Sequence, residues 1–145
     1  MNKNLTEIIF ILDRSGSMHP LEADTIGGYN SFLDQQRELP GKVLLSTVLF
    51  DTQIDVLHDR ADIAKVPALT SADYSARGCT ALLDAVQEAG KFGIDANSAV
   101  TFRADSEGVR TNFDAVSMAA AAVRATGDRG TAWREKIERT FRRER

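Results

Sequence analysis

The pattern of apolar and polar positions predicts both strands and helices along the first half of the chain. Residues 8–12 form an unbroken apolar run, which is typical of a strand covered on both faces. A helical segment opens at Pro20, carries apolar residues at spacings of three and four, and stops at Pro40. Residues 43–50 form a β-rich run, and the alternating residues 54–58 predict a half-exposed strand paired antiparallel to it.

Helical patterns dominate the second half of the chain. A polar loop over residues 70–78 leads into a predicted helix over about 80–91, which is rich in Ala and Leu. Ser106 is the expected N-cap of a further helix over 107–126. A last helix carries an apolar stripe, which we expect to be core, and has arginines in its final turn. That stripe consists of Trp133, Ile137 and Phe141.

The order strand, helix, strand, strand, helix is the opening of a doubly wound α/β fold. We therefore predict a Rossmann-like, mostly parallel sheet with flanking helices. Residues 1–126 are expected to form this domain, and residues 127–145 a C-terminal amphipathic helix that packs on it. In such folds ligands bind beyond the carboxyl ends of the strands, so the loops at that edge are the ones to search for chemistry.

Composition narrows the classes of function. A chain of 145 residues is the size of one domain. Its net charge of −3, with both signs interspersed, gives no case for binding nucleic acid or a membrane surface. A lone cysteine, Cys79, excludes an internal disulfide and suits a reducing compartment. The first residues lack the apolar core of a signal peptide, so we expect a cytoplasmic protein.

The clearest chemistry follows the first apolar run. Asp13, Ser15 and Ser17 are spaced two apart and place a carboxylate and two hydroxyls in one loop. These oxygens suit a hard divalent cation. A second loop, which ends at Thr80 and enters a helix, is expected at the same edge of the sheet.

These residues resemble the von Willebrand factor type A domain, bacterial type. The resemblance rests on Asp-x-Ser-x-Ser at 13–17 and on Gly-x-Thr-Ala-Leu at 78–82. The tripeptide Phe-Asp-Thr at 50–52 also fits the bacterial members. The resemblance spans residues 8 to about 85 and implies a metal-ion-dependent adhesion site. Its expected ligands are Asp13, Ser15, Ser17 and Thr80.

The same resemblance implies what such a site does. The expected ion is Mg²⁺, with Mn²⁺ or Ca²⁺ as alternatives, and the ion would take a carboxylate from a partner protein. The implied function is a protein-binding module rather than an enzyme.

The chain departs from the family after the second loop. The family continues with a strand that ends in Thr-Asp-Gly, and this tripeptide does not occur here. We interpret the difference as a loss of roughly forty to fifty residues near Asp84-Ala85, from typical domain size. Without that neighbour, the strand at 8–12 would lie at a sheet edge with unpaired backbone groups. A homodimer, a strand-swapped oligomer or cover by the C-terminal helices would relieve this, and we expect self-association.

Other interpretations stay open at this stage. Asp13 and Ser15 are also residues that satisfy backbone donors in turns, and Thr80 is also a good N-cap. If these residues serve only the turn and the helix cap, the chain is a remnant of the family that self-associates without metal. An aspartate after a first strand is also the nucleophile of some phosphohydrolases, but those carry a second acid where this chain has Ser15. Asp51 is expected to be a turn residue.

Overall fold

The computed structural model describes residues 4–77, 105–128 and 130–142. The predicted helix at 80–91, and with it Thr80, lies outside the described residues, as does Cys79. In chain order the described elements are β1 (Leu5–Asp13), η1 (Gly16–Leu21), α1 (Glu22–Glu38), β2 (Lys42–Phe50), β3 (Ile54–Asp62), η2 (Ile63–Lys65), α3 (Ser106–Thr126) and α4 (Ala132–Arg142).

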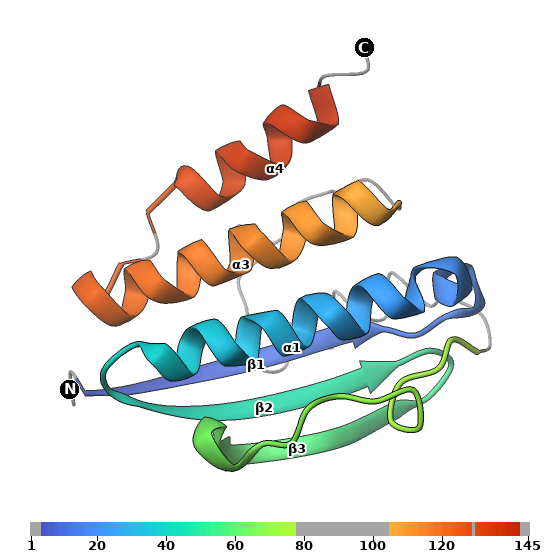
Figure 1. Ribbon diagram of the computed structural model, residues 1–145, viewed down its shortest axis with the longest axis horizontal. Helices are drawn as coiled ribbons and strands as arrows, with labels where there is room; N and C mark the ends of the chain where they lie inside the picture. Colours follow the sequence, from blue (N-terminus) through green and yellow to red (C-terminus); the bar gives the residue numbers. More distant parts are fainter. Residues whose placement is uncertain (1–3, 78–104, 129, 143–145) are drawn as a thin grey trace.

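The three described strands form one sheet in the order β1-β2-β3 (Figure 1). β1 runs parallel to β2 with Asp13 opposite Phe50, so both strands end at the same edge. β3 runs antiparallel to β2, as the alternating pattern predicts, and is longer than expected. The described residues therefore form a small mixed α/β fold, which confirms the predicted fold class at that level.

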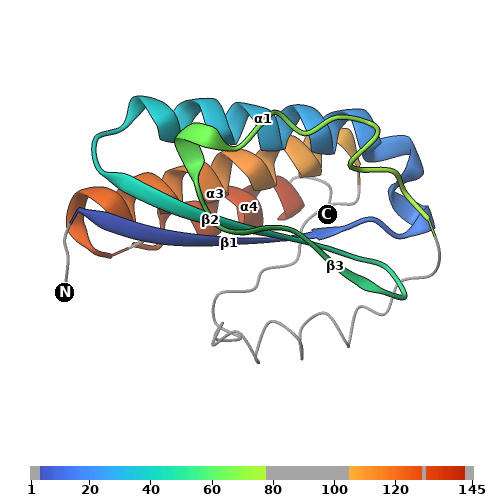
Figure 2. The ribbon, with the colours of Figure 1, turned by 90° about the horizontal axis from the view of Figure 1, so that it is seen from below.

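The helices α1 and α3 lie on the same side of the sheet (Figure 2). The core between these layers centres on Phe10 of β1. Its ring lies 4.9 Å from that of Phe32 and 5.4 Å from that of Tyr29, both on α1. On the α3 side it stacks on Phe113 at 5.7 Å. One aromatic residue of the apolar strand thus joins the sheet to both helices.

The opposite face of the sheet is more open. Ile9 of β1 is 40% exposed and Val56 of β3 is 60% exposed. The expectation that the first strand is covered on both faces is therefore wrong for Ile9. The physical reason is that α1 and α3, the described helices nearest the sheet, both pack on the face that carries Phe10.

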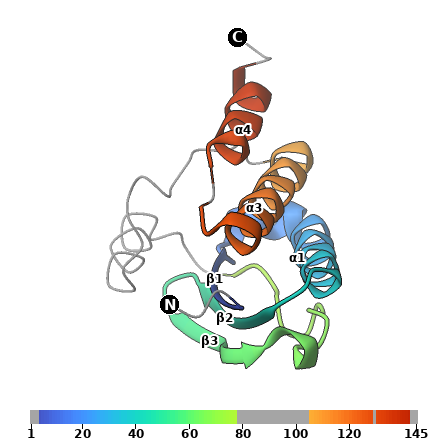
Figure 3. The same cartoon turned by 90° about the vertical axis from the view of Figure 1, so that its left-hand side faces the viewer.

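The last helix, α4, packs on α3 (Figure 3). Trp133 and Ile137 are buried there against Ala115 and the half-buried Ala119. This confirms the core role of the first two residues of the stripe, while the side chain of Phe141 lies outside the described residues.

Two helix starts differ from the sequence prediction. Pro20 lies in the 3-10 turn η1, and α1 begins two residues later at Glu22. The N-cap of α3 is Asp105 rather than Ser106, because the Asp105 carboxylate accepts the N–H of Gly108.

Within the described residues, no helix combines the length and the apolar character that a membrane span requires.

Candidate functional site

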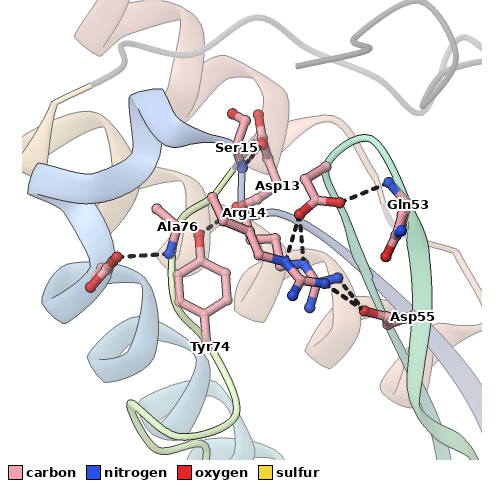
Figure 4. Close-up of polar contacts among 10 residues, drawn as sticks. Asp13, Arg14, Ser15, Gln53, Asp55, Tyr74 and Ala76 are labelled. Atoms are coloured by element: carbon pink, nitrogen blue, oxygen red, sulfur yellow. Dashed lines mark hydrogen bonds and ion pairs between the residues drawn. The ribbon is translucent and has the colours of Figure 1, made fainter. Parts of the chain in front are cut away.

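The loop after β1 brings three predicted ligands together. Asp13 ends the strand, Ser15 precedes η1, and Ser17 lies inside η1. The Asp13 Oδ1 atom accepts the backbone N–H of Ser15 at 2.7 Å, and the Ser15 and Ser17 Oγ atoms lie 3.1 Å apart. The side chains of Asp13 and Ser15 point the same way, away from the carboxylate of Asp55 (Figure 4). Ser15 is fully buried, whereas Ser17 is exposed.

This spacing can be compared with the geometry of a bound magnesium ion. Mg²⁺ holds its oxygens in an octahedron at about 2.1 Å, which puts two adjacent ligands roughly 3.0 Å apart. The 3.1 Å between Ser15 Oγ and Ser17 Oγ fits two such positions. The bond from the Ser15 N–H engages one oxygen of Asp13 and orients the carboxylate. The turn interpretation is thus correct for Asp13, and it is compatible with the ligand interpretation.

A charged network lies beside this loop. Arg14 is buried, and its Nε lies 3.4 Å from Asp51 Oδ2, while its Nη2 pairs with Asp55. Arg77 approaches the same two carboxylates, at 2.9 Å from Asp51 and 3.2 Å from Asp55. Two arginines and two aspartates are formally neutral together. Arg14 and Arg77 are therefore paired with Asp51 and Asp55 rather than with the Asp13 carboxylate.

Asp51 has two roles in this network. Its Oδ1 accepts the N–H of Gln53 at 2.7 Å, which confirms the predicted turn residue between β2 and β3. That backbone hydrogen bond, with further help from Arg77 and Arg14, lowers the pKa of the Asp51 carboxyl below its ordinary value. The Asp51 carboxylate is consequently engaged by the Gln53 N–H and by the two arginines. Sequence reasoning missed the arginine contacts, because no periodic pattern connects residues so far apart in the chain.

The segment 74–77 contacts the loop after β1 directly. The hydroxyl of Tyr74 donates to the backbone carbonyl of Asp13, and the N–H of Arg77 donates to the carbonyl of Arg14 at 2.7 Å. The N–H of Ala76 donates to Glu22 Oε1, also at 2.7 Å. The prediction of a loop here is correct, but its contacts with the site were not foreseen.

Histidine and acidic side chains do not form a metal-binding cluster in the described part of the chain. His19 Nδ1 lies 3.2 Å from Glu22 Oε1 on the surface, and His58 lies on β3. Among residues 4–77, 105–128 and 130–142, no three His, Cys, Asp or Glu side chains gather in a way that would hold a metal ion. A cation at the β1 loop would therefore depend on hydroxyl oxygens beside the single carboxylate of Asp13.

Comparison of the chain with protein-family models, with curated proteins and with solved structures found no match.

Proposed function

We propose that the Asp13–Ser17 loop binds Mg²⁺, with Mn²⁺ or Ca²⁺ as alternatives, and that the chain is a protein-binding module of the von Willebrand factor type A kind. The observation that carries the proposal is the 3.1 Å separation of the Ser15 and Ser17 hydroxyls beside the Asp13 carboxylate. All three lie at the carboxyl end of a parallel strand, where ligands of α/β folds bind.

Each residue has a distinct part in this proposal. Asp13 supplies the negative charge, and Ser15 and Ser17 offer neutral oxygens. Thr80, which lies outside the described residues, is the fourth proposed ligand. It follows Arg77 by three residues, and a chain of that length reaches at most about 11 Å between Cα atoms. A bound cation would supply a Lewis-acidic position for a carboxylate oxygen of a partner protein.

Calorimetry with Mg²⁺ tests the site. Asp13→Asn keeps an oxygen that can accept the Ser15 N–H but removes the charge, so we expect loss of Mg²⁺ binding without unfolding. The matched control is Asp34→Asn, which neutralises an exposed acid on α1 and should leave binding unchanged. Absence of heat from the wild-type protein, or equal heats from wild type and Asp13→Asn, would exclude the metal site. Hydrolysis of a chromogenic phosphomonoester that depends on Asp13 would instead favour an enzyme.

We also propose that the chain self-associates through β1. Within the described residues, β1 pairs with β2 along one edge and with no strand along the other. Leu5 and Ile9, which both lie on this strand, are 36% and 40% exposed. An open edge of this kind favours pairing with a second copy, as a homodimer or by strand exchange. Light scattering after size exclusion tests this, and a monodisperse monomer with slow amide exchange at residues 8–12 would contradict it.

A further inference from the structure

The backbone of residues 13 and 14, at the end of β1, makes hydrogen bonds with residues that lie outside the loop. The N–H of Arg14 donates to the carbonyl of Phe50 at 2.9 Å, which extends the β1-β2 ladder by one bond. The two carbonyls on either side of this amide both take partners from the segment 74–77: Asp13 O from the Tyr74 hydroxyl, and Arg14 O from the Arg77 N–H. That segment therefore fixes the two peptide units between the Asp13 carboxylate and Ser15.

We propose that Tyr74 and Arg77 are positioning residues for the Asp13–Ser17 loop, which together hold its oxygens in the arrangement that binds a divalent cation. This inference rests on the proposed metal-binding function, but it also predicts behaviour of the metal-free protein. Tyr74 acts through the Asp13 carbonyl, and Arg77 acts through the Arg14 carbonyl and through Asp51 and Asp55. Neither residue contacts the ion.

Tyr74 is suited to this role because its ring cannot move freely. The side chain is fully buried in the main core, so the position of the hydroxyl is set by packing rather than by solvent. A donor fixed in this way orients the carbonyl that accepts from it. The Asp13 carboxylate accepts the N–H of Ser15, so a shift of the backbone between residues 13 and 15 would also disturb the carboxylate.

Arg77 connects two parts of the site. Its backbone N–H bonds to the loop after β1, while its guanidinium reaches the turn between β2 and β3 through Asp51 at 2.9 Å. Arg14 approaches the same Asp51 oxygen from the loop itself. The Asp51 carboxylate thus links Arg77, the turn between β2 and β3, and Arg14 in the loop after β1.

Tyr74→Phe is the principal test, and the chain offers a matched control. Tyr29 is also fully buried, and its hydroxyl also makes one hydrogen bond, to Thr47 Oγ1 at 2.7 Å, away from the loop. Both variants should lose a similar amount of thermal stability. Only Tyr74→Phe should weaken Mg²⁺ binding, by about fivefold, which corresponds to one net hydrogen bond of about 1 kcal/mol.

A second pair of variants tests the arginine. Arg77→Ala removes the bridge to Asp51 and Asp55, whereas Arg110→Ala removes an exposed ion pair with Asp24 on the helices. We expect Arg77→Ala to weaken Mg²⁺ binding by roughly threefold, because the guanidinium is half exposed and ion pairs that reach solvent are weak. Arg110→Ala should leave the affinity unchanged.

Amide exchange in EDTA separates this inference from the metal proposal. The N–H groups of Ser15, Met18 and residue 77 are bonded within this arrangement, to Asp13 Oδ1, Ser15 O and Arg14 O. In Tyr74→Phe they should exchange at least fivefold faster than in Tyr29→Phe. If wild type binds no Mg²⁺ but this difference appears, the metal proposal fails and the positioning role stands. If exchange is equal in the two variants, and affinity too where Mg²⁺ binds, the positioning role is wrong.

Discussion

Gly27 and Gly28 are neighbours on α1, and replacing each with alanine should have opposite effects on stability. Gly27 is exposed, and a Cβ there would meet nothing within 4 Å. A Cβ at Gly28 would lie 2.7 Å from Cγ and 2.9 Å from Cε2 of Phe113. That ring is 7% exposed and stacks on Phe10, so it cannot turn aside without disturbing the core.

The magnitudes follow from these contacts. Alanine is favoured over glycine inside a helix by about 1 kcal/mol, so Gly27→Ala should stabilise the protein by roughly 0.5–1 kcal/mol. Gly28→Ala receives the same benefit, but forcing a methyl group into a packed core costs about 1–3 kcal/mol, and more when backbone must shift. We expect Gly28→Ala to destabilise the protein by about 1–2 kcal/mol.

Urea unfolding followed by far-ultraviolet circular dichroism measures both variants under identical conditions. The midpoint should rise for Gly27→Ala and fall for Gly28→Ala, with equal m-values. The clash also predicts that Phe113→Leu, which removes the ring, will reduce the cost of Gly28→Ala. The reasoning is refuted if the two alanine variants are equally stable, or if the cost at Gly28 is the same beside Leu as beside Phe at position 113.

Two further predictions concern the core and the end of α1. Tyr29 and Tyr74 are the only tyrosines, and burial raises the pKa of both, that of Tyr74 to about 12. Their stabilising effect is therefore present below about pH 10 and lost as the pH rises toward 12, and tyrosinate absorbance of the folded protein should stay low at about pH 10.5. Half-ionisation there, without unfolding, would contradict their burial. Arg124 donates to the carbonyls of Gln36 and Leu39 at the end of α1. Arg124→Ala should destabilise by about 1–2 kcal/mol in thermal melts, since charged hydrogen bonds contribute more than neutral ones, and an unchanged melting temperature would contradict this.

Much of the local structure follows from the sequence pattern. The apolar run at 8–12, the β-rich run at 43–50 and the alternation at 54–58 correctly locate three strands and the antiparallel pair. The errors lie where local rules compete. A proline at position 20 is as compatible with a 3-10 turn as with a first helical turn, and Asp105 and Ser106 are both good N-caps.

The candidate site was predicted only in part. Asp13, Ser15 and Ser17 lie within five consecutive residues, so their spacing after one strand already suggests a shared loop. The network of Arg14, Asp51 and Arg77 joins residues far apart in the chain. Such contacts depend on how strands align, and a pattern read along the chain carries no information on that.

By itself, the sequence determined which oxygens stand together after the first strand, because neighbours in the chain are neighbours in space. It also determined that the fold mixes helices and strands, because the period of apolar residues selects strand or helix. Only the tertiary structure decided what holds that loop in place. Tyr74 lies 61 residues from Asp13, and its hydroxyl reaches the Asp13 carbonyl because the core fixes its ring. The sheet register decided that this loop lies beside the turn after β2, since it brings the ends of β1 and β2 to one edge.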